Sequence, residues 1–256
     1  MNSNPPTIGV LIRFANSEAT LPHVLEALKQ QTVQPDHILG VASHSTDRSR
    51  DLMQAADAEV IEWPWAYDHS RVLNFGLRQL HTDLVLVLSS HTVLESPDAI
   101  ERMVACFNDE RVACVSAKWD DDPFYSDAVD WHELKTKGLR FGSIYSNSMG
   151  MIRRCLWDQL PFDEKIQSSE DYAWAIEQLK RGHVCRRLGL RFSYKRSGTN
   201  RDREFARIVF QFARQHGLPV TWLGVTGAVK EILSGKPSHA TRERLLAWLG
   251  STLSLH

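Results

Sequence analysis

Short runs of consecutive apolar residues recur along the chain, and the clearest is Leu84 to Leu88, which reads Leu-Val-Leu-Val-Leu. A strand with one face in water alternates apolar and polar residues, whereas this run is apolar on both faces. Similar runs stand at Ile8 to Phe14, His37 to Ser43 and Val112 to Ala117. We therefore expect strands buried on both sides, as in a parallel sheet that is covered by helices.

Segments with helical periodicity separate these runs. Between Leu21 and Gln31, apolar residues recur at a spacing that places them on one face of a helix. Comparable helices are expected over residues 45–56, 70–80, 97–107 and 170–181, and further strands over residues 59–63, 143–152 and 184–190. Strands that alternate with helices predict an α/β fold, with a mostly parallel central sheet flanked by helices.

The pattern changes beyond residue 200, where apolar and arginine residues at helical spacing continue to the end of the chain. We therefore divide the chain into a domain of residues 1–200 and a helical C-terminal extension of residues 201–256. The extension is expected to pack on the domain. The alternatives are that it forms a homodimer contact or lies on a membrane surface.

Charge balance and apolar content limit the partners and the location. With 30 basic and 31 acidic residues, the chain has a formal net charge of -1, which gives no reason to expect nucleic acid as a partner. Four cysteines without a Cys-x-x-Cys pair do not support a zinc or thiol redox motif. The N-terminus lacks an apolar signal core, and no apolar run approaches the ~20 residues of a spanning helix. We expect a cytoplasmic protein with at most peripheral contact with the inner membrane.

Several short motifs follow one another along the chain. They are Ile12-Arg13-Phe14-Ala15-Asn16, Val41-Ala42-Ser43-His44-Ser45-Thr46-Asp47, Arg71-Val72-Leu73-Asn74-Phe75-Gly76 and Glu170-Asp171. In order and spacing they resemble the motifs of family 2 glycosyltransferases, which have the GT-A fold. In style they resemble the rhamnosyltransferase-like enzymes of surface polysaccharide assembly. The likeness covers residues 7 to 198.

This resemblance implies an inverting glycosyltransferase of polysaccharide or glycolipid biosynthesis. It would move a sugar from a nucleotide donor to a hydroxyl group of a glycan or lipid-linked acceptor. The attacking hydroxyl needs a general base, which the family places in the Glu-Asp pair. Asp171 is the expected base, and Glu170 is expected to orient it or to bind acceptor hydroxyls. Alternatively, two carboxylates at the start of a helix complement the helix dipole.

The donor side departs from the family pattern. The family's acidic residue that accepts a hydrogen bond from the nucleotide base is replaced by Ala42 or Ser43. A serine hydroxyl bonds a base edge more weakly than a carboxylate does. The donor contacts that the resemblance implies are Phe14, Asn16, Ser43, Arg71, Asn74, Ser89, His91, Lys195 and Arg196.

The metal-binding motif is degenerate. The family's Asp-x-Asp, which holds a divalent cation such as Mg²⁺ or Mn²⁺, reads Ser89-Ser90-His91. Hard cations prefer carboxylate oxygens, so His91 is the one candidate ligand here and metal dependence stays open. Because basic side chains can also clamp phosphoryl oxygens, we hypothesise that Lys195 or Arg196, with Arg71, replaces part of the metal's role. The alternative is that these are solvated loop charges.

Aromatic residues are frequent between Trp63 and Trp131. Sugar rings present apolar faces that stack on aromatic side chains, so Trp119 and Trp131 are expected acceptor contacts. Core packing is the alternative for both.

A function of another class is also consistent with these motifs. The chain could be a non-catalytic nucleotide-sugar or glycan-binding protein that keeps the pocket of a degenerate transferase. The Ser89-Ser90-His91 segment favours this alternative, and the Glu170–Asp171 pair favours the enzyme. A nucleotidyltransferase is disfavoured because the chain lacks a Gly-rich phosphate loop near its first strand.

Overall fold

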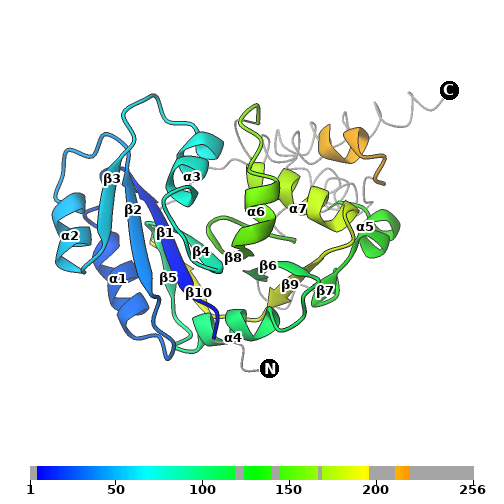
Figure 1. The fold of residues 1–256 in the computed structure, drawn as a ribbon, viewed down its shortest axis with the longest axis horizontal. Coiled ribbons are helices and arrows are strands. Elements are labelled where there is room, and N and C mark those ends of the chain that lie inside the picture. The colour runs from blue at the N-terminus through cyan, green and yellow to red at the C-terminus, as the bar shows by residue number, and fades with distance from the viewer. Residues whose placement is uncertain (1–4, 119–123, 140–143, 167–168, 196–210, 220–256) are drawn as a thin grey trace, which may run out of the picture.

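A mixed eight-stranded sheet forms the centre of the computed structural model, which describes residues 5–118, 124–139, 144–166, 169–195 and 211–219 (Figure 1). The strand order is β3-β2-β1-β4-β8-β6-β9-β7. These strands are β1 (Ile8–Phe14), β2 (His37–Ala42), β3 (Glu59–Glu62), β4 (Leu84–Ser89), β6 (Val112–Ala117), β7 (Ala128–Val129), β8 (Met149–Arg153) and β9 (Val184–Leu188). Strands β1 to β4 pair in parallel, as do β6 and β9, while β7 and β8 are antiparallel to their neighbours. The predicted α/β fold with a mostly parallel sheet is confirmed.

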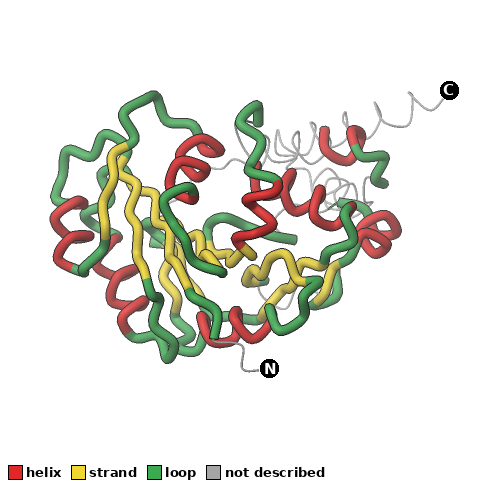
Figure 2. The backbone as a smooth tube through the Cα atoms, viewed as in Figure 1, coloured by secondary structure: helices red, strands yellow, loops and turns green. Residues whose placement is uncertain are grey.

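Helices cover both faces of the sheet (Figure 2). They are α1 (Leu21–Lys29), α2 (Ser49–Ala55), α3 (His69–Leu77), α4 (Ala99–Cys106), α5 (Trp131–Lys137), α6 (Arg154–Gln159) and α7 (Glu170–Lys180). Successive residues of a strand point to opposite faces, so β1 sends Ile12 into the core beneath α1 and α4 and Leu11 into the core beneath α3 and α7. Both side chains are fully buried, as the continuous apolar strands predict.

Helix α3 packs unusually close to the sheet. A Cβ atom at Gly76 would lie only 2.5 Å from a methyl carbon of Leu11 and 2.8 Å from one of Val41. Such distances are shorter than real carbon contacts, so only glycine allows this approach. The residues of α3 are therefore held directly against β1 and β2.

A small second sheet joins two distant segments. Strand β5 (Thr92–Leu94) pairs antiparallel with β10 (Phe192–Tyr194). Beyond the ladder, the backbone N–H of Lys195 donates to the carbonyl oxygen of His91 at 2.8 Å. The sequence did not predict either strand, because three residues are too few to show a period.

The C-terminal extension lies mostly outside the described residues, of which only 211–219 belong to it. The division at residue 200 and the packing of the extension therefore stay predictions. In the part of the chain that the structure describes, no helix has both the length and the apolar character needed to cross a membrane.

Candidate active site

Polar residues gather where the parallel strands β1, β2 and β4 end. Arg13 near the end of β1 is paired in register with Ser89 at the end of β4, and Ser43 directly follows β2. By alternation along each strand, they face the side of the sheet that α3 and α7 cover. Helix α7 begins at Glu170 on that side, so residues distant in sequence meet at one edge.

Glu170 is buried and is bound by side chains rather than by its own helix. Its Oε1 accepts a hydrogen bond from Nδ2 of Asn147 at 3.2 Å and lies 3.7 Å from Nη1 of Arg13. Ser169, the residue before the helix, has a left-handed φ of 66° and makes no side-chain cap. Both carboxylates lie in the first turn of α7, so the helix-dipole alternative for the pair stays open beside the catalytic one.

Asp171 is partly exposed beside it and is oriented by backbone groups. Its Oδ2 accepts the N–H of Asn147 at 3.0 Å, and its Oδ1 accepts the N–H of Tyr172 at 2.8 Å. Burial and the adjacent charge of Glu170 raise the pKa of Asp171 to about 7, against the opposing effect of these hydrogen bonds and of Arg13. A carboxylate with this pKa can take a proton near neutral pH.

Arg13 is a functional candidate that the sequence analysis missed. Its side chain is 14% exposed, and its one ion pair in the described structure is with Glu170. Burial acts to lower the pKa of Arg13, but Tyr67, Glu170 and Asp171 outweigh it and raise that pKa. The available signal was a charged residue inside the apolar run of the first strand.

The side chains of two predicted donor contacts lie in the protein interior, and both contacts stay predictions. Phe14 is buried in the core on the far side of the sheet from Arg13. Asn74 is buried in α3, and all its hydrogen-bonding positions are filled. Its Nδ2 donates to the Phe162 carbonyl and to Glu164, and its Oδ1 accepts from the Trp157 ring and the Phe162 N–H.

Three other predicted donor contacts lie at or near the polar edge. The buried hydroxyl of Ser43 has no hydrogen-bond partner among the described residues. Asn16 is exposed, and its Oδ1 accepts the N–H of Thr46 at 2.8 Å, which ties the loop after β1 to the loop after β2. Arg71 is exposed on α3, with its Nε 3.8 Å from an oxygen of Glu164. All three stay predicted donor contacts.

The segment in place of the metal motif connects β4 to β5. The N–H of Ser89 donates to the Ser148 carbonyl at 3.0 Å, and the His91 ring lies 5.8 Å from that of Tyr194. Within the described ranges, no three His, Cys, Asp or Glu side chains cluster in a way that could hold a metal ion. Binding of a divalent cation at this segment stays a prediction, with His91 as the candidate ligand. Lys195 lies beside His91 and is exposed, whereas Arg196 falls outside the described residues.

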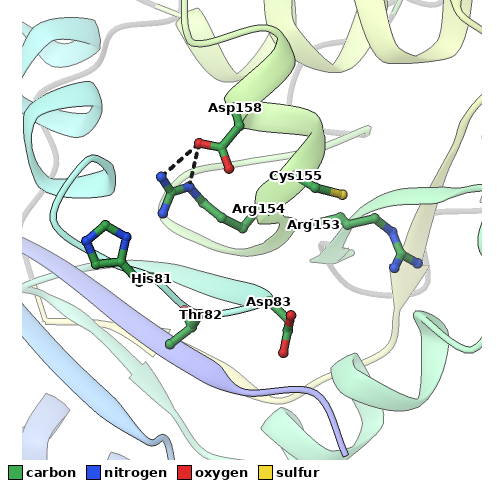
Figure 3. Close-up of a pocket in the computed structure, with 7 residues that line it drawn as sticks. All are labelled: His81, Thr82, Asp83, Arg153, Arg154, Cys155 and Asp158. Atoms are coloured by element: carbon green, nitrogen blue, oxygen red, sulfur yellow. Dashed lines mark hydrogen bonds and ion pairs between the residues drawn. The ribbon is translucent and has the colours of Figure 1, made fainter. Parts of the chain in front are cut away.

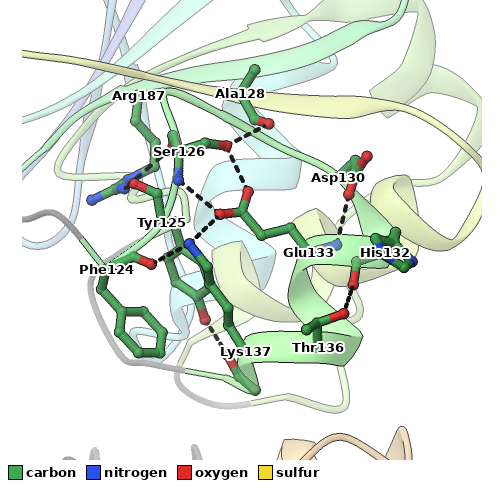
Figure 4. A network of polar contacts seen from close by, with 11 residues as sticks. Phe124, Tyr125, Ser126, Ala128, Asp130, His132, Glu133, Thr136, Lys137 and Arg187 are labelled. Carbon is green, nitrogen blue, oxygen red and sulfur yellow. Dashed lines mark hydrogen bonds and ion pairs between the residues drawn. The ribbon is translucent and has the colours of Figure 1, made fainter.

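The predicted acceptor contacts are only partly visible. Trp119 lies outside the described residues. Trp131 begins α5 and packs, half-buried, against the core, with the Lys135 ammonium 5.8 Å from its ring centroid. A polar network holds α5 in place, in which Glu133 accepts from the Ser126 hydroxyl at 2.6 Å and from Lys137 at 2.8 Å (Figure 4). An acceptor contact by Trp131 stays a prediction.

A cavity of about 340 Å³ lies elsewhere, at the amino end of β4 and the start of α6 (Figure 3). Arg154 and Asp158 bond each other on its wall at 2.8 Å. The guanidinium of Arg153 donates hydrogen bonds to the carbonyl oxygens of Phe107, Asp109 and Val112. This cavity is at the opposite end of β4 from Ser89 and belongs to a different part of the molecule from the carboxylate pair.

Comparison with known proteins agrees with this arrangement. The fold is that of GT-A glycosyltransferases. Glucosyl-3-phosphoglycerate synthase from Mycobacterium tuberculosis, solved with Mn²⁺, uridine diphosphate and glucosyl-3-phosphoglycerate, superposes with a TM-score of 0.62 at 16% identity over 84% of this chain and 82% of that one. A sequence profile described as Glycosyl transferase family 2 matches residues 10–159, more than half of the chain, and the protein belongs to this family.

Two curated relatives share part of the sequence. The O-antigen chain rhamnosyltransferase RfbN of Salmonella typhimurium is 26% identical over 196 residues, which are 69% of this chain and 62% of the relative. The O-antigen chain rhamnosyltransferase WbaN of Salmonella anatum is 25% identical over 189 residues, which are 66% of this chain and 60% of the relative. The chain thus spans about three fifths of the length of these relatives. The family and the rhamnosyltransferase-like style that the motifs predicted are confirmed.

Proposed function

We propose that the protein is an inverting glycosyltransferase that moves a sugar from a nucleotide donor to a hydroxyl group of a glycan or lipid-linked acceptor. The observation that carries the proposal is the Glu170–Asp171 pair at the carboxyl edge of the sheet, in which Glu170 is buried and the pKa of the partly exposed Asp171 is raised to about 7. The two curated relatives are named for rhamnosyl transfer in O-antigen chains, so nucleotide-activated rhamnose is the first donor to test. We place the reaction in the cytoplasm, at the inner membrane when the acceptor is lipid-linked.

Asp171 would act as general base. As the acceptor oxygen attacks the anomeric carbon from the side opposite the leaving group, Asp171 accepts the hydroxyl proton. The new glycosidic bond forms, the bond to the diphosphate breaks, and the nucleoside diphosphate leaves with the electron pair. Its negative charge would be met in part by Lys195 or Arg196, with Arg71. Support comes from the position of Lys195, which lies beside the Ser89-Ser90-His91 segment.

The test is Asp171→Asn, which keeps the shape of the side chain and removes its basicity. We expect transfer to fall at least about 100-fold with an unchanged circular dichroism spectrum, because a positioned base contributes about that much or more. Asp158→Asn is the matched control, since Asp158 pairs with Arg154 at the opposite end of the sheet. An Asp171→Asn enzyme with wild-type transfer would refute the assignment of the base.

A binding protein without catalysis is the second candidate, supported by the replacement of the metal-binding carboxylates with Ser89 and His91. Hydrolysis and binding of a panel of nucleotide sugars separate the two functions. Tight binding of a donor without turnover of any donor would favour the binding protein.

A further inference from the structure

Two buried polar atoms beside the carboxylate pair have no hydrogen-bond partner among the described residues. They are Nη1 of Arg13 and Oδ1 of Asn147. Both side chains reach the same atom, Oε1 of Glu170: Arg13 lies 3.7 Å from it, and Asn147 donates to it from Nδ2 at 3.2 Å. The two unpartnered atoms thus belong to one small cluster next to Asp171.

The hydrogen bonds that hold this cluster in place do not involve Nη1 of Arg13 or Oδ1 of Asn147. The bond from Nδ2 to Glu170 fixes the amide of Asn147 so that Oδ1 points elsewhere. The backbone N–H of the same residue is already used by Asp171. Native proteins rarely leave buried polar atoms unpaired, and those that are unpaired commonly bind water or a ligand.

One of the two atoms needs a hydrogen-bond acceptor as its partner, and the other needs a donor. The guanidinium nitrogen of Arg13 can only donate, and the amide oxygen of Asn147 can only accept. A hydroxyl group satisfies both, because its oxygen accepts and its proton is donated. An ionised phosphate oxygen can accept from Arg13 but has no proton for Asn147, and Glu170 would repel it.

We propose that Arg13 and Asn147 form a hydroxyl-binding subsite that holds an acceptor hydroxyl next to the one that Asp171 deprotonates. The proposal rests on the transferase function proposed above and deepens it. It defines the acceptor as a sugar with a free hydroxyl adjacent to the attacking hydroxyl. Arg13 and Asn147 are then specificity-determining residues, and Glu170 is the positioning residue that holds both.

A crystal structure of the full chain without ligand tests the subsite independently of activity. We expect an ordered water oxygen that bonds both Nη1 of Arg13 and Oδ1 of Asn147, standing in for the hydroxyl. A direct bond from either atom to a protein group would overturn the proposal, and one candidate is the buried hydroxyl of Tyr145, which also has no hydrogen-bond partner among the described residues. In crystals soaked with uridine diphosphate or thymidine diphosphate, a phosphoryl oxygen on Arg13 would overturn it as well.

Kinetics of Arg13→Gln then test the role in the acceptor site. The assay uses nucleotide-activated rhamnose and lipid-linked glycan extracted from cells that lack this enzyme. We expect the acceptor KM to rise about tenfold or more, as for loss of a hydrogen bond to a charged group, with the donor KM within about twofold of wild type. Arg111→Gln is the control, because Arg111 pairs with Asp109 on the surface.

An unchanged acceptor KM, or a rise in the donor KM alone, would refute the subsite. If the wild-type protein transferred no sugar at all, the proposed function would fail, while the crystal structure would still decide whether the cluster binds a hydroxyl.

Discussion

Two features of the surroundings of Asp171 have opposite effects on its pKa. It lies in a polar, largely enclosed position next to the charge of Glu170, which favours its protonated form. Yet its two oxygens accept backbone N–H groups that hold the ionised form in one orientation. As the proposed general base, Asp171 would be oriented before the acceptor arrives, with a pKa close to neutral pH.

This environment predicts the pH dependence of transfer. The acid form of Asp171 cannot accept a proton, and its pKa of about 7 means that the active fraction falls as the pH falls below that value. We expect kcat to be level above about pH 8 and to fall nearly tenfold for each unit below about pH 6. Measuring kcat from pH 5 to 9 checks this. A rate that stays level down to pH 5 would show that no group with a raised pKa limits catalysis.

At the scale of elements, Asn74 joins helix α3 to α6 and to the segment that follows α6. Its four hydrogen bonds reach Trp157, Phe162 and Glu164, all on the chain that leads to the carboxylate pair. Through this amide, the helix packed against β1 and β2 also positions the segment that precedes α7.

Replacing Asn74 with alanine should therefore destabilise the fold. It leaves the Trp157 ring N–H and the Phe162 backbone groups buried without partners, and we expect a loss of about 2–4 kcal/mol. Urea denaturation measures the loss, and Asn108→Ala, at an exposed position, is the control. Wild-type stability together with weakened donor binding would contradict this structural role and support the prediction that Asn74 contacts the donor.

Elements of sufficient length were predictable from the sequence, and contacts between distant elements were not. The runs that became β1 and β4 are long and apolar enough to identify strands buried on both faces. The contact of Arg13 with Glu170 depends on how β1 and α7 meet in space, which no local period encodes. Asn74 matched a family motif, and only its buried environment shows that its hydrogen bonds are spent inside the protein.

At the scale of the whole molecule, the proposed source of positive charge for the leaving diphosphate is a set of basic side chains, in place of part of a metal's role. The described residues offer no three-ligand cluster, while Lys195 stands beside the segment that replaces the Asp-x-Asp motif. Charge for the leaving diphosphate would then come from side chains contributed by separate parts of the fold.

We accordingly expect transfer to persist in excess chelator. Activity with and without ethylenediaminetetraacetate is the measurement, followed by addition of Mn²⁺ or Mg²⁺. Complete loss of transfer in chelator, restored by Mn²⁺, would rule out a metal-independent reaction.

Strand β8 has a consequence for how the chain is made. It lies between β4 and β6, so until residue 153 has left the ribosome, β4 is an edge strand whose residues are all apolar except Ser89. An unpaired apolar edge is a template for aggregation, and its closure has to wait for a partner far along the chain. Synthesis of the stretch between β4 and β8 is therefore the interval in which the nascent protein most needs a chaperone, and truncation before β8 should yield insoluble chain.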